Sequence, residues 1–394
     1  MLGELRMIYF DNSATTKIDP SALETYQKVA QDIWGNPSSL HELGDQAFQM
    51  LETARKQVAS LLGFKPYEIF FTSGGTESDN WAIKGTALAK REFGRHIITS
   101  SVEHPAVMNS VLQLEQLGFE VTILPVDASG RVSVADLRQA IRKDTILVSI
   151  MAVNNEIGAI QPIQEIGDLL EDYPTVHFHV DAVQGLGKNL WQKIYHRRID
   201  LMSFSGHKFH GPRGIGILYK KERRQIAPLM TGGGQERDLR SGTENTPAIA
   251  AMAKALRLLL TDEPEKAEHQ LAIKGKIYDY LKDKPGIQIF SPLTDDFSPH
   301  VLCFSLVGIR GETVVHTLES KGIYFSTTSA CSSKKGIESS TLKAMQVPEK
   351  VATSAVRLSF DENNTMAEAD EFIATFEPIY QHFYAINHHG NEAK

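Results

Sequence analysis

A lysine beside a histidine stands in the stretch SFSGHKFHGPRGIG, residues 203–216, directly after an apolar strand pattern. A turn rich in serine and glycine is an unusual position for a surface charge. A lysine in a partly desolvated pocket can have its pKa lowered enough to form a Schiff base with a carbonyl compound. Lys208 is therefore a candidate catalytic residue, and the alternative is an ordinary loop lysine.

A second candidate is Asp181, which ends the strand pattern HFHV in the stretch HFHVDAVQG. An aspartate in that position can ligate a metal, cap a helix or pair with a cation. A protonated pyridine nitrogen is such a cation, and a carboxylate beside it keeps the ring of pyridoxal phosphate (PLP) an electron sink. Asp181 precedes Lys208 by 27 residues (208 − 181), enough for one helix and one strand that bring both to the same sheet edge.

The stretch TSGGTESDN, residues 72–80, predicts a turn between a strand and a helix. Small residues at a helix N-terminus let backbone N–H groups surround a phosphate, and the helix dipole assists. The stretch lacks the Gly-Lys-Ser/Thr of a nucleotide-binding P-loop and the GxGxxG pattern of a dinucleotide site. It favours the phosphate of a smaller cofactor, although glycine turns before helices are common.

Four further side chains fit the same site. His104 follows a strand pattern in SVEHPAV, where its ring could stack on a flat cofactor; the alternative is a satisfied core or surface histidine. Asn155 in NNEIG could bond a ring oxygen, and Thr243, in the glycine-rich stretch 232–247, could donate to a phosphate. Arg357 in SAVRLSF is either a surface charge on an edge strand or a fork for a substrate carboxylate.

The chain has two cysteines, and their surroundings differ. Cys331 lies in STTSACSSKKGIESS, residues 326–340, whose small polar residues are typical of an exposed, mobile loop. Cys303 lies in HVLCFSLVG, which predicts a buried strand and a structural role for the thiol. A disulfide between the two is possible, but the core interpretation of Cys303 is preferred, and Cys331 is expected to be reduced.

Composition narrows the function classes. The chain has 394 residues, a formal net charge of −7 and an isoelectric point near 6.1, with no Lys/Arg stripe that indicates duplex nucleic-acid binding. No apolar run reaches the roughly 18 residues that a membrane helix needs, and the N-terminus does not resemble a signal peptide. We therefore expect a cytoplasmic protein that binds neither nucleic acid nor membrane directly.

The order of apolar and amphipathic segments predicts an α/β fold. From about residue 21 to 260, short strands alternate with helices, which implies a mainly parallel sheet covered on both faces, with ligands at the carboxyl ends of the strands. A smaller α+β region follows, with strands near 301–306 and 355–359 and helices near 312–321 and 366–382. We predict a large domain over residues 17–260, and a small one over 1–16 and 261–394 that holds the cysteine loop.

Nine short motifs together resemble one family along nearly the whole chain, from about Tyr9 to Asp361. The resemblance is to the NifS/IscS-type cysteine desulfurases, of the class-V aminotransferase family and fold-type I PLP enzymes. It implies a mainly parallel seven-stranded sheet in the large domain. SACSS, 26 residues before Arg357 (357 − 331), resembles the long mobile-loop type of the family. In order, the motifs are FDNSATT, GNPSS, FTSGGTESDN, VEHPAV, VNNEIG, HVDAVQ, SFSGHK, GGGQERDLRSGT and SACSS.

The resemblance assigns a role to each matching residue. Lys208 is implied as the Schiff-base lysine, Asp181 as the partner of the pyridine nitrogen, and His104 as the residue stacked on the ring. Cys331 is implied as the sulfur acceptor. The other implied contacts are Asn155 and Gln184 with the ring hydroxyl and the substrate side; Gly75, Thr76, Ser205 and His207 with the phosphate; Thr243 with the phosphate of the neighbouring subunit; and Arg357 and Asn36 with the substrate carboxylate.

The function that the resemblance implies is conversion of L-cysteine to L-alanine by a homodimer. Sulfur would pass to Cys331 as a persulfide and then to an acceptor protein, such as an iron–sulfur scaffold or a tRNA thiolase. No intrinsic metal is expected, although Cys331 could transiently ligate an iron–sulfur cluster. The alternatives are a selenocysteine lyase, a kynureninase-like hydrolase or an aminotransferase of the same fold, and a non-enzymatic sulfur-relay scaffold.

Overall fold

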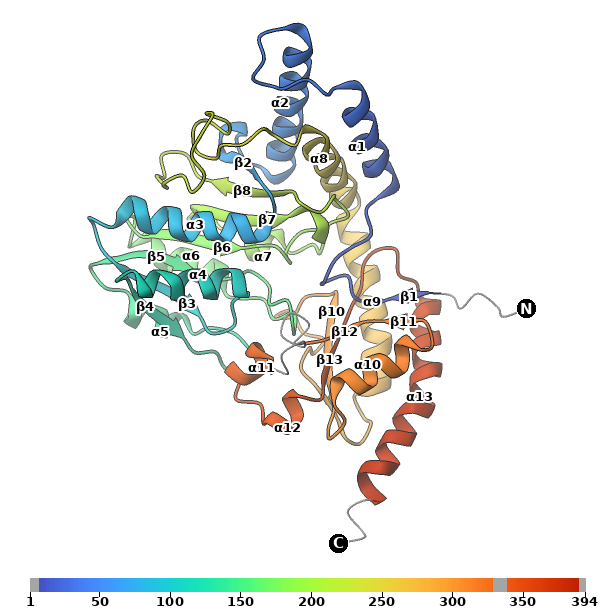
Figure 1. Ribbon diagram of the computed structural model, residues 1–394. Coiled ribbons are helices and arrows are strands. Elements are labelled where there is room, and N and C mark those ends of the chain that lie inside the picture. The colour runs from blue at the N-terminus through green and yellow to red at the C-terminus, as the bar shows by residue number, and fades with distance from the viewer. Residues whose placement is uncertain (1–6, 329–338, 390–394) are drawn as a thin grey trace.

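The computed structural model describes residues 7–328 and 339–389, and its larger part is built on a seven-stranded sheet (Figure 1). The strand order is β2-β8-β7-β6-β5-β3-β4. In this sheet β8 runs in the direction opposite to that of the other strands. The predicted seven-stranded, mainly parallel sheet is confirmed. The strands are β2 (Ile69–Thr72), β3 (His96–Ser100), β4 (Glu120–Leu124), β5 (Thr145–Ser149), β6 (His177–Asp181), β7 (Leu201–Ser205) and β8 (Gly216–Lys220).

Helices cover both faces of this sheet, and the side chains of β3 illustrate why. Ile97 packs with residues of α3 and α4 on one face, whereas Ile98 packs with residues of α6 on the other. Successive side chains of a strand point to opposite faces, so an apolar pair here requires cover on both sides. The helices of this part are α1 (Pro20–Asp32), α2 (Glu42–Leu62), α3 (Gly75–Lys90), α4 (Pro105–Gln116), α5 (Val134–Ala140), α6 (Ile163–Glu171), α7 (Trp191–Ile194) and α8 (Thr246–Leu260), with 3₁₀ turns η1 (Pro66–Glu68) and η2 (Gly206–Lys208).

The first helix begins earlier than its sequence pattern suggests. A start capped by Ser21 is the simplest prediction, but the cap is Asp19, whose Oδ1 accepts from the backbone N–H groups of Ser21 (2.7 Å) and Ala22 (3.0 Å). Pro20 occupies the first helical position, where its missing N–H costs nothing. The prediction was wrong because a carboxylate two residues upstream, followed by proline, forms a better cap than the serine.

A second sheet lies beside the first, in the C-terminal part of the chain (Figure 1). It has four antiparallel strands in the order β12-β13-β10-β9, and β1 pairs with β11 in a separate parallel ribbon. The predicted strands at 301–306 and 355–359 are confirmed. The elements are β1 (Ile8–Tyr9), β9 (Ile287–Ile289), β10 (Val301–Leu306), β11 (Ile323–Tyr324), β12 (Ser326–Thr327), β13 (Ala355–Ser359), α9 (Glu263–Leu281), α10 (Gly311–Glu319), α11 (Ser340–Ala344), α12 (Glu349–Ala352) and α13 (Met366–His389).

The buried apolar residues fall into separate clusters. One large cluster draws on residues between 22 and 259, whereas another combines Ile8 and Phe10 with residues between 273 and 380. A smaller cluster, containing Ile157, Phe297 and Cys303, joins the two parts. The N-terminal strand thus packs with the C-terminal region, while the exact domain limits 17–260 and 1–16 plus 261–394 remain a prediction.

Cys303 is a buried core residue, as its sequence context predicts. It is fully buried in β10 with a free thiol, and burial raises the pKa of that thiol. Cys331 and most of the loop that contains it lie outside the described residues. Among the helices within the described ranges, none combines the length and apolar character needed to cross a lipid bilayer.

Phe372 on α13 links several segments of the C-terminal core. Its ring lies 5.5 Å from that of Phe376, 6.1 Å from Phe10 and 6.4 Å from Phe325. Phe372→Ala should therefore lower the free energy of unfolding by about 3–5 kcal/mol, measured by denaturant titration. Phe93→Ala is the matched control, because Phe93 is 78% exposed and its loss should change stability by at most about 0.5 kcal/mol. Equal losses in the two variants would contradict the assignment of Phe372 to the core.

Candidate active site

A cavity of about 540 Å³ opens at the carboxyl ends of β5, β6 and β7. Its wall includes residues 13–15 from the N-terminal segment and Thr328, Ser340 and Arg357 from the C-terminal part. The strand ends of the large sheet thus meet residues from both ends of the chain. Ten of the predicted site residues line it: Gly75, Thr76, His104, Asn155, Asp181, Gln184, Ser205, His207, Lys208 and Arg357.

Two of the predicted site residues within the described ranges, Asn36 and Thr243, do not line this cavity. Asn36 is exposed, and its Oδ1 accepts from the backbone N–H of Ser38 at 2.9 Å. Thr243 is exposed in the connection between β8 and α8, outside the cavity lining formed by the described residues. Cys331 lies outside the described residues, and Thr328 and Ser340 are the lining residues that flank its segment in the sequence.

Asp181 is the last residue of β6 and is 5% exposed. Its Oδ1 accepts from the backbone N–H of Val183 at 3.0 Å. Burial raises the pKa of this carboxyl, while His104 in its protonated form and the charge of Lys208 act in the opposite direction. A carboxylate buried in this way is stabilised by a cation placed against it, so the site fits a protonated ring nitrogen.

A second carboxyl, that of Asp79 on α3, lies close enough to Asp181 for the charge of Asp181 to raise the pKa of Asp79. Asp79 is 1% exposed, and its pKa is raised well above the usual value, first by burial and then by the charge of Asp181. The nearest ring is His179, with Nε2 3.6 Å from Asp79 Oδ1, but burial lowers the pKa of His179 to about 3 and leaves it neutral. His179 therefore supplies no positive charge to this pair.

Lys208 ends the turn η2, which directly follows β7. Its Nζ donates to the backbone carbonyls of Ser13 at 2.5 Å and Ala14 at 2.8 Å. Gln184 Nε2 donates to the same Ser13 carbonyl at 3.0 Å. The segment FDNSATT thus orients the lysine amine inside the cavity, a role that no sequence pattern indicated for Ser13 or Ala14.

His104 is the N-cap of α4, and its Nδ1 accepts from the N–H of Ala106 at 3.1 Å. Burial lowers the pKa of the imidazole, so the ring is neutral at neutral pH. The contact with Ala106 fixes the ring on the wall of the cavity. A neutral, fixed aromatic ring in that place suits stacking against a flat cofactor.

The start of α3 forms an anion-binding corner of the cavity. The N-cap is Gly74, which has no side chain, so the first-turn amides face the cavity directly. A Cβ on Gly75 would lie 2.8 Å from Val183 Cγ2, so the close approach of the backbone requires glycine there. Burial is the main cause that lowers the pKa of His207 to about 4, which makes it a neutral hydrogen-bonding group beside this corner. The corner fits a phosphate.

Arg357 lies in β13, between β12 and β10, and is 4% exposed. The alternative of a surface charge on an edge strand is therefore wrong, because the strand is paired on both sides. Nη1 donates to the carbonyl of Asn155 at 2.8 Å, and Nη2 lies 3.0 Å from Asp11 Oδ1. The guanidinium lines the cavity from the C-terminal part of the chain, as a carboxylate-binding fork would.

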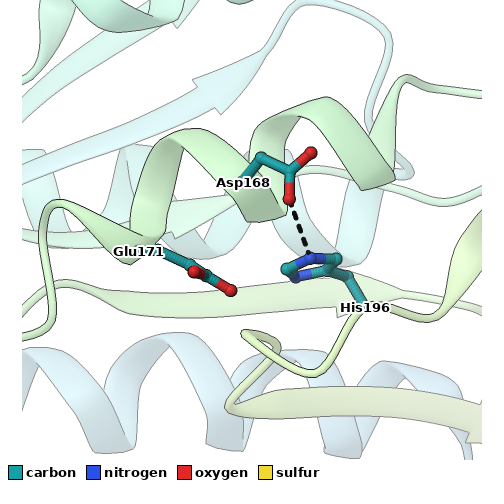
Figure 2. A group of neighbouring side chains, drawn as sticks. All are labelled: Asp168, Glu171 and His196. Carbon is teal, nitrogen blue, oxygen red and sulfur yellow. Dashed lines mark ion pairs between the residues drawn. The ribbon is translucent and has the colours of Figure 1, made fainter.

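One cluster of potential metal ligands lies outside the cavity lining. Figure 2 shows Asp168, Glu171 and His196, whose ligand atoms lie within 4.8 Å of one another. His196 Nε2 is 3.2 Å from Asp168 Oδ1, and its Nδ1 accepts from the backbone N–H of Arg198. Glu171 pairs with Arg197 at 2.8 Å. Each side chain has a protein partner, so the group is explained as surface ion pairs.

Comparisons with known proteins agree with this geometry. The family described as aminotransferase class-V matches residues 8–372. A "NifS/IcsS protein homolog" from Lactobacillus delbrueckii subsp. bulgaricus is 69% identical over 98% of this chain and the whole of that protein. The "Cysteine desulfurase IscS" of Methanosarcina thermophila is 43% identical over 96% of this chain and 93% of that protein.

The chain belongs to the class-V aminotransferase family, among the NifS/IscS cysteine desulfurases. Membership implies PLP as the cofactor, and the fit of Asp181 and the α3 corner agrees with that. A solved structure described as "NIFS-LIKE PROTEIN" superposes with a TM-score of 0.88 at 39% identity, over 95% of this chain and 99% of that one. Another, described as "SspA in complex with cysteine", gives 0.77 at 32% identity, over 91% and 100%.

Glu103, next to His104, provides a test of the buried electrostatics. Its Oε1 accepts from Ser100 Oγ at 2.6 Å and from the N–H of Met151 at 2.9 Å, and burial raises its pKa from 4.5 to about 8. Below pH 4.5 the group is protonated in folded and unfolded chains alike. Between 4.5 and 8 the folded chain keeps a proton that the unfolded chain loses, so stability falls as pH rises through that window.

Glu103→Gln should remove this dependence. Relative to the unmodified chain, the variant's free energy of unfolding should increase as pH rises from 5 to 8, measured by denaturant titration at each pH. The exposed Glu115 supplies the control, because Glu115→Gln removes the same charge from the surface of α4. A pH profile unchanged by Glu103→Gln would mean that Glu103 is ionised in the folded chain.

Proposed function

We propose that the cavity binds PLP and converts L-cysteine to L-alanine, with Cys331 accepting the sulfur. The observation that supports this most directly is the meeting of Lys208, Asp181 and His104 at neighbouring strand ends, with Arg357 in the wall of the same cavity. PLP, when bound, supplies a carbonyl for the lysine amine and an electron-withdrawing ring. Cysteine as substrate agrees with the membership of this chain in the cysteine desulfurases and with the similar structure that was solved in complex with cysteine.

Each wall of the cavity has a proposed binding role. Asp181 pairs with the ring nitrogen and His104 stacks on the ring, because one is a buried carboxylate and the other a fixed neutral imidazole. The first turn of α3 binds the phosphate with backbone N–H groups. The remaining proposed contacts are Gly75, Thr76, Ser205 and His207 with the phosphate, Asn155 and Gln184 with the ring hydroxyl and substrate side, and Arg357, assisted by Asn36, with the substrate carboxylate.

The chain's own groups then perform the proton and sulfur transfers. Arg357 holds the substrate carboxylate, which directs the α-hydrogen toward one side of the cavity. Lys208 Nζ, oriented by the carbonyls of Ser13 and Ala14, or the nearby His104 as the alternative catalytic group, takes and returns that proton. The Cys331 thiolate attacks the substrate sulfur. An S–S bond forms as the Cβ–S bond breaks, the electron pair of the broken bond passes to the substrate side, and a proton taken up at Cβ completes the methyl group of alanine.

Substitution of Lys208 and substitution of Cys331 should block different steps of the reaction. Lys208→Ala should abolish the visible absorbance of the bound cofactor after cofactor exchange, together with alanine release, because the amine that reacts with the cofactor is lost. Cys331→Ala should retain that absorbance but lose persulfide formation, measured by alkylation and mass spectrometry. Cys303→Ala is the matched control, since Cys303 is buried and should leave persulfide formation unchanged.

Sulfide release from free L-cysteine by Cys331→Ala at the unmodified rate would contradict the acceptor role. Alanine formation from selenocysteine alone would favour the selenocysteine lyase alternative. Catalytically inactive variants that still deliver sulfur would favour a relay scaffold. The acceptor, an iron–sulfur scaffold or a tRNA thiolase, is identified by following labelled persulfide from Cys331 into candidate proteins.

We also propose that the active form is a homodimer in which Thr243 reaches the partner's phosphate site. The connection between α1 and α2 exposes Trp34 (70%) and Leu40 completely, an unusual exposure of large apolar groups. The buried ion pair of Arg55 on α2 with Glu236, at 2.8 Å, ties the loop before Thr243 to α2, the helix that follows this connection. A second copy covering this connection would bury the apolar groups and bring Thr243 next to a second cavity.

Leu40→Glu should shift the chain from dimer to monomer in sedimentation velocity experiments, because it introduces a charge among apolar groups that the partner would bury. Phe93→Glu is the control: Phe93 is also exposed, at 78%, but follows α3, away from the connection between α1 and α2. A dimer that persists in Leu40→Glu at micromolar concentration would contradict the proposed interface. Equal dissociation by Phe93→Glu would do so as well.

A further inference from the structure

We infer that Asp11 is a positioning residue that fixes the Arg357 guanidinium for the carboxylate of the amino-acid substrate. The inference rests on the role proposed above for Arg357 as the carboxylate fork. Asp11 belongs to the N-terminal segment and is 346 positions away from Arg357 in the sequence. The fold brings them together through an isolated bridge between Asp11 and Ser359, the last residue of β13.

The two oxygens of Asp11 are used on different partners. Oδ1 lies 3.0 Å from Arg357 Nη2, and Oδ2 accepts from Ser326 Oγ at 2.6 Å. Ser326 is the residue directly opposite Arg357 in the pairing of β12 with β13. The carboxylate is therefore held by a hydroxyl from the neighbouring strand while it holds the guanidinium.

The backbone around Asp11 is equally constrained. The N–H of Asn12 donates to the carbonyl of Ser359 at 3.2 Å, and the N–H of Ser359 donates to the carbonyl of Phe10 at 2.7 Å. The N–H of Ser13 donates to Ser359 Oγ at 2.8 Å. Asp11 thus stands on a segment bonded on both sides to the end of the strand that contains Arg357, so its carboxylate has little freedom to follow a moving guanidinium.

The remaining donors of Arg357 define what it can bind. Nη1 contacts Asn155 and Nη2 contacts Asp11, whereas Nε is buried and has no hydrogen-bond partner among the described residues. A buried donor without a partner is costly, and a planar carboxylate can accept from an arginine edge in two parallel bonds. Arg357 lines the cavity, and fixing one side of its guanidinium with Asp11 gives the remaining donors a defined orientation.

Another carboxyl near Arg357, that of Glu156, has different partners. Its two oxygens accept from Ser339 Oγ and, at 3.3 Å, from Ser340 Oγ. Burial raises the pKa of Glu156, which disfavours its charged form. Asp11 is therefore the carboxylate that pairs with the guanidinium directly, and its removal is the specific test.

The test measures ligand binding by the PLP-loaded enzyme through the change in its visible absorbance. L-alanine, which has a carboxylate, is compared with L-alaninol, which has none. Asp11→Asn should weaken L-alanine binding about tenfold and leave L-alaninol binding unchanged, since only the carboxylate needs the oriented guanidinium. In turnover, the variant should raise KM for L-cysteine by a similar factor with little change in kcat. Asp11→Glu should restore part of the loss, because it keeps the charge.

Two further variants keep the outcome interpretable. Ser326→Ala removes only the second support of Asp11 and should weaken L-alanine binding less than Asp11→Asn does. Arg357→Gln should abolish the preference for L-alanine over L-alaninol. If Arg357→Gln abolishes that preference and Asp11→Asn does not change it, the inference about Asp11 is wrong while the role of Arg357 stands.

Other results would overturn the inference in different ways. Equal weakening of both ligands by Asp11→Asn would assign Asp11 to general stability of the fold. Tighter L-alanine binding in Asp11→Asn would make Asp11 a competitor of the substrate and not its positioning residue. A preference that survives Arg357→Gln would instead disprove the proposed carboxylate site, and with it the inference.

Discussion

The burial of the Asp181 carboxylate is the constraint on which the site depends. An ionised carboxyl in an apolar interior is expensive unless a cation or several donors face it. Here one backbone N–H donates to Asp181, a second carboxyl, that of Asp79, lies nearby, and the buried His179 beside Asp79 is neutral. The positive charge is therefore best supplied from the cavity side, which is where a protonated ring would lie. The raised pKa of Asp181 has the same origin, since burial outweighs the nearby His104 and Lys208.

The N-terminal segment contacts several of the other residues that line the cavity. Residues 11–15 run between the two sheets, and five hydrogen bonds or ion pairs join them to residues that the sequence motifs had singled out. Because the segment packs with the C-terminal core through Ile8 and Phe10, it links Arg357 in the small sheet to Lys208 beside the large one. These contacts are Asp11 with Arg357, Ser13 with Lys208 and with Gln184, Ala14 with Lys208, and Thr15 with His207.

The sequence predicts the parts of this arrangement that depend on local pattern. Alternating strands and helices predict the sheet, and polar residues after strands predict that Asp181, Lys208 and His104 converge, because parallel strands end at one edge. The contacts of Asp79 and Asp11 with the site cannot be predicted from local pattern. Asp79 lies on the buried side of an otherwise ordinary helix, and Asp11 meets Arg357 only through pairing with the last strand. The edge-strand alternative for Arg357 failed for the same reason, since strand order within a sheet is not encoded locally.

Thr243 and Asn36 are a different case for prediction from sequence, because the single chain does not bring them to its own cavity. Both are exposed, and in the proposed homodimer a second copy would supply their surroundings. The roles of the two cysteines are distinguished by the burial of Cys303. Burial raises the pKa of the Cys303 thiol and removes it from the surface, so it can be neither the thiolate nor the donor to another protein. This leaves Cys331 as the proposed sulfur acceptor, and Thr328 and Ser340, which flank its segment in the sequence, line the cavity.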